Sequence, residues 1–591
     1  MVRFIWRFRL IIKMNLAFFM LFNLTSCTDV KETTYNSGII ISILTDKARY
    51  GLNEQVKISI EYKGELLEKK SNSLRIEITH LEKLVYEETL LIQENTSWLE
   101  FVWHPPLVDY SGYLVNVYLI VNDKVIDQRN IAVDVSSTWE VFPRYGYLAN
   151  FDLESKEEIE VIISKLNRYH LNGLLFYDWQ YKHDRPISQT QGVLDDSWLN
   201  IANKKVYASK ILAYIVELHK LNMKASNYNL AYGVYEDYLK DNVEIALYRD
   251  SIQILKDKHD LPNTWASDLY LVNPLNKTWQ NHFIQMEKEV NDFFAFDVIH
   301  LDTLGNRGTL FDTFGKPINM EYALAEFTKK LKSELNQSIV FNTVNEYAKY
   351  EIFKSNSVDF AYTEVWPDKY PTYASLKDII DKDRKNGLAS VLACYMNYNM
   401  KSGNFNTSAV LYTEAVILAS GGAHISHGDL GMLSSEYFPN NKLSMTEELA
   451  DKMIEYGDFM VAYENLLRGN LKENNHGLSL EQFEHNTLPV AKSIWLFSKE
   501  NEKYKTIHLI NLLNRNISVW RDDNDISIPP TSLKNVKIKM PLDTVTIEGV
   551  YVASPDIDGG SSKKLDYEID DNVISIIVPK LDYWTMVYIV K

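Results

Sequence analysis

Two acidic residues, Asp302 and Glu364, each end an apolar stretch of the sequence. The first stretch is FDVIHLDTLG (296–305) and the second is VDFAYTEVW (358–366). Apolar runs of this length are typical of strands buried on both faces, as in a parallel sheet. In barrels built from such strands, catalytic side chains stand at the C-terminal strand ends. We therefore predict that Asp302 and Glu364 face one barrel mouth as a catalytic pair.

Cleavage of a glycosidic bond requires two carboxyl groups that flank the anomeric carbon. Asp302 is short and is followed by Thr303 and backbone donors, so we expect it to stay ionised and act as the nucleophile. Glu364 is followed by Val365 and Trp366. An apolar setting raises the pKa of a carboxyl group and suits an acid/base. On spacing alone, two unrelated surface acids explain the pattern equally well.

The segment 139–474 alternates strand-like and helix-like patterns, which predicts parallel strands with helical crossovers. Eight such units predict a (β/α)8 TIM barrel, with extended loops accounting for its length. Asp302 ends the fourth strand and Glu364 ends the sixth, which is compatible with one shared mouth. The eight strand candidates are 144–150, 173–178, 224–228, 298–302, 339–343, 360–364, 390–395 and 422–427.

Short alternating strands separated by turn residues flank this barrel on both sides. Segment 38–138 contains patterns such as VKISIEY and GYLVNVYLIV, and segment 475–591 contains SIWLFSKE and TVTIEGVYVASP. Such spacing is typical of β-sandwiches. We predict an N-terminal immunoglobulin-like β-sandwich with a buttressing role and a second β-sandwich that closes the chain. The fold class is therefore multidomain, with a central barrel between two sandwiches.

The N-terminus combines basic residues with an apolar stretch that ends in LTSC (24–27). The stretch is too short to span a bilayer and is typical of a signal peptide, here 1–27. LTSC resembles the bacterial lipobox, which predicts that Cys27 is lipidated and that 28–37 is a tether. An ordinary secretory signal with a chance cysteine is the alternative. We expect a lipid-anchored protein of the bacterial cell envelope, at the periplasmic or surface face of the outer membrane.

The amino-acid composition limits the kinds of partner and bound group that this protein is expected to have. The net charge is −17, which disfavours nucleic acid or another anionic polymer because like charges repel. The 37 Tyr and 12 Trp residues suit a protein that stacks sugar rings. The only cysteine besides Cys27 is Cys394, so a lipidated chain has no thiol left for a disulfide or a Cys-based metal site. We expect a monomer.

Several stretches together resemble glycoside hydrolase family 66. FDVIHLDTLG and DFAYTEVWPD are similar to the family's nucleophile and acid/base segments. The order of an immunoglobulin-like region, a barrel and a β-sandwich also matches. The supporting stretches are GLLFYDWQYKHDRP, TWASDLYLVNPLNKTWQ, LASGGAHISHGD and EYFPN.

This resemblance implies retaining cleavage of α-1,6-glucan, with Asp302 as nucleophile, Glu364 as acid/base and no cofactor. The family contains endo-dextranases and cycloisomaltooligosaccharide glucanotransferases. The transferases typically carry a carbohydrate-binding module in the barrel region, and the stretch between the seventh and eighth strands is too short for one here. We therefore favour an endo-dextranase acting on dextran. A glucanotransferase and a non-catalytic glycan-binding lipoprotein remain the alternatives.

The resemblance also implies residues that contact the sugar. The residues after the second strand would line the donor side of the substrate site, although packing of the loop explains them too. The residues after the third and fifth strands could contact sugar or could instead cap the following helices. His424, with His427 and Asp429, is expected at the mouth of the eighth strand, and we predict no metal there. The predicted substrate-binding residues are Asp178, Trp179, Tyr181, His183, Tyr228, Asn345, Trp366 and His424.

Overall fold

The structure is a computed structural model that describes residues 37–64, 72–93, 96–152, 154–438, 442–542 and 546–591. The span Asn36–Lys591 is one compact unit. The predicted signal peptide, the lipidation site Cys27 and positions 28–36 of the tether lie outside the described residues. None of the described helices is long and apolar enough to cross a membrane.

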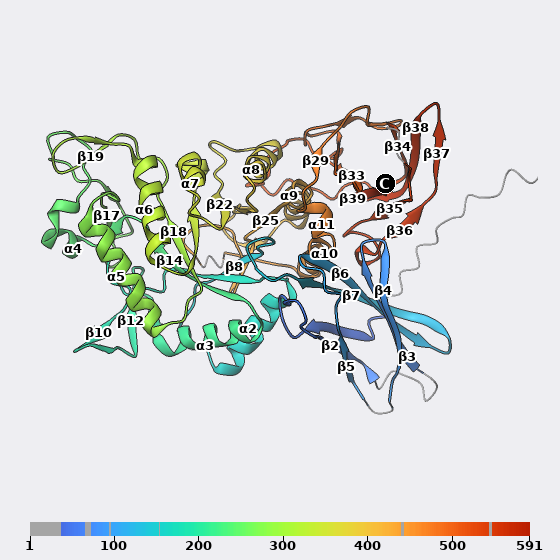
Figure 1. Cartoon of the computed structure of the whole chain (residues 1–591), viewed down its shortest axis with the longest axis horizontal. Helices are drawn as coiled ribbons and strands as arrows, with labels where there is room; N and C mark the ends of the chain where they lie inside the picture. Colours follow the sequence, from blue (N-terminus) through green and yellow to red (C-terminus); the bar gives the residue numbers. More distant parts are fainter. Residues whose placement is uncertain (1–36, 65–71, 94–95, 153, 439–441, 543–545) are drawn as a thin grey trace, which may run out of the picture. The chain divides into compact units, whose positions relative to one another are not determined.

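A curled sheet of ten strands forms the centre of the fold (Figure 1). Eight of its strands pair in parallel in the order of the chain, and the sheet comes back to its first strand through the pair Gly428–Tyr147. This arrangement fits the predicted barrel, and each predicted strand position holds a strand. The strands are β8 (Tyr145–Leu148), β9 (Gly173–Phe176), β14 (Lys224–Leu230), β18 (Val298–Asp302), β21 (Ser338–Asn342), β22 (Phe360–Glu364), β23 (Ser390–Ala393) and β25 (Gly422–His424), followed by β26 (His427–Gly428) and β27 (Gly431–Met432).

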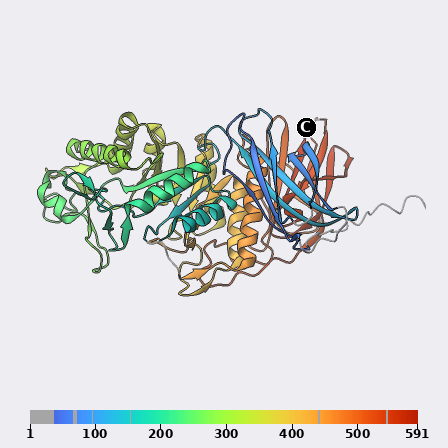
Figure 2. The same ribbon diagram turned by 90° about the horizontal axis from the view of Figure 1, so that it is seen from below.

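Helices follow the barrel strands along the chain and appear as turquoise to orange coils in Figures 1 and 2. The first is preceded by the N-cap Ser155, whose side chain forms a capping box with Glu158, and it buries one apolar stripe against the sheet. Helix α9 differs because it is buried on all sides. The helices are α2 (Lys156–Arg168), α3 (Ala208–Lys220), α4 (Glu236–Asp241), α5 (Lys277–Phe293), α6 (Met320–Glu334), α7 (Lys349–Ser355), α8 (Tyr373–Lys385), α9 (Thr407–Ser420), α10 (Glu447–Ala462) and α11 (Glu464–Leu467).

Long loops after the strands carry short strand pairs of their own. The loop after β14 holds a three-stranded sheet in the order β15-β17-β16. These additions account for the length of the barrel region. The short strands are β10 (Gln189–Thr190), β11 (Val193–Leu194), β12 (Ser197–Leu199), β13 (Lys205–Tyr207), β15 (Gly233–Val234), β16 (Lys258–His259), β17 (Leu269–Leu271), β19 (Leu310–Phe311), β20 (Pro317–Ile318), β24 (Gly403–Asn404) and β28 (Leu443–Ser444).

Two antiparallel sheets precede the barrel. Their buried side chains, such as Ile60 and Phe101 from one sheet and Ile76 and Val115 from the other, belong to one apolar cluster. The three-stranded sheet contains β1 (Ile40–Thr45), β2 (Val56–Tyr62) and β5 (Trp98–Trp103). The four-stranded sheet contains β4 (Lys83–Leu91), β3 (Asn72–His80), β6 (Ser111–Val121) and β7 (Lys124–Val135).

Two further sheets follow the barrel and also share one buried cluster, which includes Leu496 and Ile538. The domain boundaries at 138 and 474 stay predictions. The larger sheet contains β29 (Lys472–Glu473), β31 (His485–Asn486), β32 (Ile494–Glu500), β33 (Tyr504–Asn511), β39 (Trp584–Val590), β35 (Gly549–Ala553) and β36 (Lys563–Leu565). The smaller contains β30 (Ser479–Leu480), β34 (Leu533–Pro541), β38 (Val573–Leu581) and β37 (Tyr567–Asp570).

A buried carboxylate on α10, Asp458, joins the barrel to the N-terminal sheets. It accepts hydrogen bonds from the Arg168 guanidinium at 2.9 and 3.0 Å and from the backbone N–H of Ala132 at 2.9 Å. The His170 imidazole lies 2.7 Å away. Removing one partner of a buried ion pair leaves the other charge without compensation.

We therefore expect Asp458→Ala to lower the free energy of unfolding by about 3–5 kcal/mol, because Arg168 loses its buried counter-charge. Urea denaturation followed by tryptophan fluorescence measures the change. Asp451→Ala is the matched control, since Asp451 lies on the same helix but is exposed; it should change stability by less than about 0.5 kcal/mol. Equal effects of the two substitutions would contradict the assignment.

Candidate active site

Three neighbouring strands bring Asp302, Asn342 and Glu364 together at the same edge of the sheet. Each of these residues is the last residue of its strand: β18, β21 and β22. The amide Nδ2 of Asn342 donates to Asp302 Oδ1 at 2.8 Å and to Glu364 Oε2 at 2.9 Å. One nitrogen therefore bridges the two predicted catalytic carboxylates. Their nearest oxygens cannot be farther apart than these two distances together.

The amide orientation of Asn342 follows from a third contact. The backbone N–H of Glu364 donates to Asn342 Oδ1 at 3.2 Å. An N–H group can donate only to the amide oxygen, so the NH2 group must point toward the carboxylates. Asn342 is itself 3% exposed, and this close packing holds the bridge in place.

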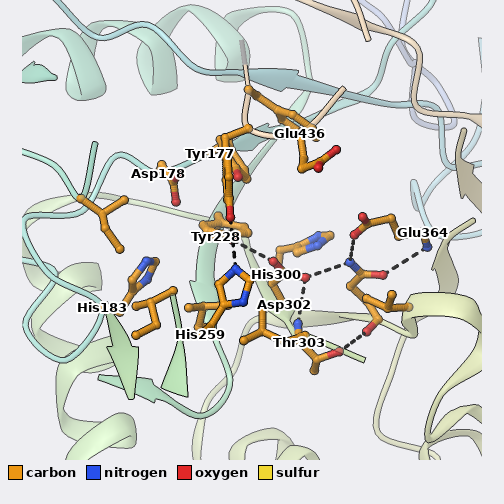
Figure 3. A pocket seen from close by; sticks show the side chains of 18 of the residues that line it. Tyr177, Asp178, His183, Tyr228, His259, His300, Asp302, Thr303, Glu364 and Glu436 are labelled. Atoms are coloured by element: carbon orange, nitrogen blue, oxygen red, sulfur yellow. Dashed lines mark hydrogen bonds between the residues drawn. The ribbon is translucent and has the colours of Figure 1, made fainter. Parts of the chain in front are cut away.

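Each carboxylate has further donors of its own. Tyr228 Oη donates to Asp302 Oδ2 at 2.8 Å, and the backbone N–H of Thr303 donates to Oδ1 at 2.8 Å. Trp366 Nε1 donates to Glu364 Oε1 at 2.8 Å. The hydroxyl of Tyr395 donates to the same oxygen at 3.3 Å. Dashed lines in Figure 3 trace the bonds around Asp302 and Glu364.

Burial raises the pKa of both acids, and the charge of one of them adds to the rise for the other. Burial, followed by the charge of Asp302, raises the pKa of Glu364 to about 7. Burial also raises the pKa of Asp302, while the hydrogen bonds from Tyr228, Asn342 and Thr303 act in the opposite direction. The pKa of Glu364 is therefore raised, as the sequence predicts, but Trp366 does not contribute to the rise. Trp366 lowers this pKa because its indole N–H stabilises the ionised form.

The two acids line a cavity of about 240 Å³. Aromatic and aliphatic side chains form most of its wall, including Tyr177, Tyr362 and Phe438, and His300 contributes from the strand that carries Asp302. Burial lowers the pKa of His300 to about 3, so this imidazole is neutral. Aromatic walls with a few converging polar groups are typical of small-molecule sites.

Four predicted substrate-binding residues line this cavity: Asp178, His183, Tyr228 and Trp366. Burial, followed by the charge of Asp302, raises the pKa of Asp178 to about 7. Burial lowers the pKa of His183 to about 4, and its Nδ1 lies 3.0 Å from Asn229 Oδ1. His183 therefore offers a neutral ring to the cavity. Figure 3 shows Asp178 and His183 on the side away from Glu364.

The structure places two other predicted residues, Trp179 and Tyr181, outside the described cavity lining. Trp179 is 0% exposed, and its indole N–H donates to Asn227 Oδ1 at 2.9 Å. A ring packed on all sides has no face for a sugar, so the substrate-binding role predicted for Trp179 is wrong. The ring of Tyr181 instead lies under the cations of Lys182 and Arg185.

Asn345 and His424 are also absent from the described lining. Asn345 Oδ1 accepts from the backbone N–H of Trp366 at 2.8 Å, so Asn345 orders the loop after β21. His424 lies 2.6 Å from Glu414 Oε1 and 2.9 Å from the carbonyl of Cys394. His424 ends β25, at the predicted position, but both its ring nitrogens are occupied inside the fold, so the substrate-binding role predicted for it is wrong.

The sequence reasoning missed Asn342, Tyr395 and Glu436. Asn342 carried a usable signal, since it is the last residue of a strand between the two strands that end in Asp302 and Glu364. Glu436 lies in a loop without periodic pattern, and only its contacts identify it. Tyr398 Oη donates to Glu436 Oε1 at 2.6 Å. The other carboxylate oxygen, Glu436 Oε2, is buried without a hydrogen-bond partner among the described residues.

Two loops meet across the cavity through Tyr437. Its hydroxyl lies 3.1 Å from His259 Nε2, and its ring meets Trp265 edge-on at 4.8 Å. His259 and Trp265 belong to the loop after β14, whereas Tyr437 follows β27. All three line the cavity. The cavity is therefore enclosed by loops as well as by the strand ends.

No three His, Cys, Asp or Glu side chains within the described ranges are grouped as a metal site. The histidines and the acid singled out in the sequence have other contacts. His427 Nδ1 lies 2.6 Å from the Ser426 hydroxyl. Asp429 accepts from the backbone N–H groups of Ala149 and Asn150, with distances of 2.9–3.3 Å.

Replacing the bridging amide tests this geometry without any substrate. Asn342→Ala removes a donor from the ionised form of both acids, so we expect the pKa values of Asp302 and Glu364 to rise. Titration of 13C-labelled carboxyl groups by NMR measures the shift. Asn345→Ala is the matched control, because Asn345 contacts the Trp366 backbone rather than either acid. Unchanged pKa values in Asn342→Ala would show that the bridge is not formed.

Comparison with known proteins places this site in a family. The chain is 27% identical to a cycloisomaltooligosaccharide glucanotransferase of Niallia circulans, over 93% of this chain and 72% of the relative. It is 25% identical to a dextranase of Streptococcus salivarius, over 82% of this chain and 68% of the relative. The solved structure of a Paenibacillus sp. cycloisomaltooligosaccharide glucanotransferase, complexed with cycloisomaltoheptaose, superposes with a TM-score of 0.86 at 25% identity, covering 93% of this chain and 99% of that one.

The family model for glycosyl hydrolase family 66 matches residues 45–588. That match includes the curled sheet, the cavity and both carboxylates. The resemblance suggested by the sequence is therefore confirmed, and the protein belongs to glycosyl hydrolase family 66.

Proposed function

We propose that this protein is a retaining endo-dextranase that cleaves α-1,6-glucosidic linkages within dextran. The Asn342 bridge is the observation that carries the proposal. Retaining glycosidases hold their two carboxyl groups about 5–5.5 Å apart, whereas inverting enzymes need about 6.5–9.5 Å to admit a water. One amide nitrogen 2.8 and 2.9 Å from the two acids supports the retaining spacing.

In the proposed first step, Asp302 attacks the anomeric carbon and forms a covalent glycosyl ester. Glu364 gives its proton to the departing glycosidic oxygen, so the leaving chain ends in a hydroxyl group. In the second step, Glu364 takes a proton from water, and the resulting oxygen nucleophile displaces Asp302 with a second inversion. A pKa of about 7 lets Glu364 serve as acid and then as base.

The donors around the acids support this division of roles. Tyr228, Asn342 and the Thr303 backbone all donate to Asp302, which stabilises its ionised form. Glu364 also accepts three hydrogen bonds, so the charge of Asp302 makes the difference. It raises the pKa of Glu364, and we therefore assign the proton of the pair to Glu364. We assign Asp178 and His183 to the sugar on the non-reducing side of the cleaved bond, and Trp366 to the departing chain.

We favour hydrolysis over cyclisation because this chain lacks segments that the glucanotransferase contains. The alignment with the Niallia circulans glucanotransferase spans 709 positions, more than the 591 residues of this chain. That relative therefore contains inserted segments without a counterpart here. Between Asn397 and Gly422 the chain forms only a short strand and α9, which supports the expectation that no binding module is inserted there.

Incubation with dextran and with starch tests the activity. We expect linear isomaltooligosaccharides from dextran, no release from starch, and a rapid fall in dextran viscosity, because an endo-enzyme cuts inside the chain. Asp302→Asn and Glu364→Gln should each lower the rate on dextran by a factor of about 10²–10⁴ or more. Chromatography of the products distinguishes linear from cyclic sugars, and mainly cyclic products would favour the glucanotransferase. Near wild-type rates in either variant would refute the pair.

The stereochemistry of azide rescue separates the two roles. With an α-isomaltooligosaccharyl fluoride, Asp302→Gly should give a β-glycosyl azide, because azide replaces the nucleophile and inverts the centre once. Glu364→Gly should give an α-glycosyl azide, because azide attacks the covalent intermediate and completes the second inversion. The same anomer from both variants would contradict the assignment.

We also propose that both regions that flank the barrel are β-sandwiches. A separate proposal is that lipid on Cys27 holds the enzyme at the bacterial cell envelope. The lipobox-like LTSC stretch supports the anchor. The full chain expressed in a Gram-negative host should enter the detergent phase of a Triton X-114 extraction. Cys27→Ser should move it to the aqueous phase, because no acyl chain can be attached. Equal partition of the two proteins would argue against a lipid anchor.

A further inference from the structure

A loop from the C-terminal region reaches the wall behind the acid/base. It lies between β33 and β34 and is held by the barrel through several hydrogen bonds. Asn397 donates its backbone N–H to the carbonyl of Arg521 at 2.9 Å and its side-chain amide to the carbonyl of Asp522 at 2.8 Å. The indole of Trp520 donates to the carbonyl of Tyr370 at 2.7 Å. These bonds fix the backbone on both sides of one cation, Arg521.

The Arg521 guanidinium lies against two aromatic rings. Its central carbon is 3.8 Å from the ring centre of Tyr398 and 5.5 Å from that of Trp366. The two rings also meet edge-on at 5.7 Å. Arg521 is 5% exposed, and its Nε lies 3.2 Å from Asp523 Oδ1. Planar guanidinium groups stack on aromatic faces, and the attraction is stronger away from water.

Both of these rings are hydrogen-bond donors to acids of the cavity. Trp366 Nε1 donates to Glu364 Oε1 at 2.8 Å, and Tyr398 Oη donates to Glu436 Oε1 at 2.6 Å. Arg521 is outside the described lining of the cavity. The Arg521 guanidinium therefore contacts the ring faces of Trp366 and Tyr398, whereas the polar atoms of these two side chains point to the acids.

We propose that Arg521 is a positioning residue for Glu364: its guanidinium holds Trp366 and Tyr398 so that their polar atoms stay aimed at the two glutamates of the cavity. This inference rests on the proposed acid/base role of Glu364. The C-terminal region thereby becomes part of the catalytic apparatus rather than a support alone.

The physical reason is the freedom that the rings have without the cation. An indole can turn about two side-chain bonds, and a small rotation removes its N–H from the line to Glu364 Oε1. Hydrogen bonds weaken steeply when they bend. A misplaced Glu364 protonates the departing oxygen less well, and misplacement of about 1 Å already costs large factors in rate. Attack by Asp302 is not affected, because its donors lie on β14 and β21 and at Thr303, directly after β18.

The experiment compares leaving groups, because only poor ones need the acid. The value of kcat/KM is measured for dextran and for a 2,4-dinitrophenyl α-isomaltooligosaccharide, whose phenol departs without a proton. Arg521→Met should lower kcat/KM about 10–100-fold on dextran, a part of the roughly 10²–10⁴-fold that general acid catalysis contributes. It should change the value for the aryl glycoside by less than about threefold. Arg521→Lys should fall between, since Lys keeps the charge but not the planar stack.

The control is Asp525→Asn, an exposed position of the same loop, where Asp525 Oδ1 accepts from Asn406 at 2.7 Å. It should leave kcat/KM on both substrates unchanged. Equal losses on both substrates in Arg521→Met, or no loss on dextran, would overturn the proposal. If Arg521→Met does not fold, Arg521→Lys decides by the same comparison. Glu364→Gln is run in parallel, and if it lacks the dextran-specific loss, the acid/base role itself fails.

Discussion

The site depends on one side-chain amide placed between two carboxylates. Like charges this close in a poorly solvated cavity repel strongly, and burial disfavours each of them further. Asn342 offsets this cost by giving one N–H to Asp302 and one to Glu364. Its oxygen is occupied by the Glu364 backbone, so the amide cannot turn over. Attraction to a shared donor thus holds the two acids close together and opposes the rise that burial causes in both pKa values.

The parallel barrel makes this arrangement available. In a parallel sheet neighbouring strands run in step, so their last residues meet at one edge. Leu301 pairs with Phe341, and Asn342 pairs with Tyr362. Strand β21 lies between the strands of the two acids. An amide at its end reaches both neighbours, whereas Asn345, three residues later in the loop, reaches the Trp366 backbone instead.

Parts outside the strands complete the environment of the acids. Tyr437 closes the cavity from a loop after the last strand, and Arg521 comes from the C-terminal region. Trp366 links the strand-end acid to the C-terminal region, since its indole N–H contacts Glu364 while its ring contacts Arg521. The acid is therefore held by contacts between residues far apart in the chain. The barrel fixes the position of Glu364, and the packed aromatic groups fix its direction.

The sequence by itself determined the alternation of strands and helices, the strand positions and the two acids at strand ends. These features depend on local periodicity, and the family resemblance added the expected chemistry. Only the tertiary structure decided that Asn342 bridges the acids and that Glu436 lines the same cavity. It also decided that Arg521 packs on Trp366 and Tyr398, and that Trp179 and His424 face the interior. The reason is physical: which way a loop or strand-end side chain points depends on its packing partners, and those partners are distant in sequence.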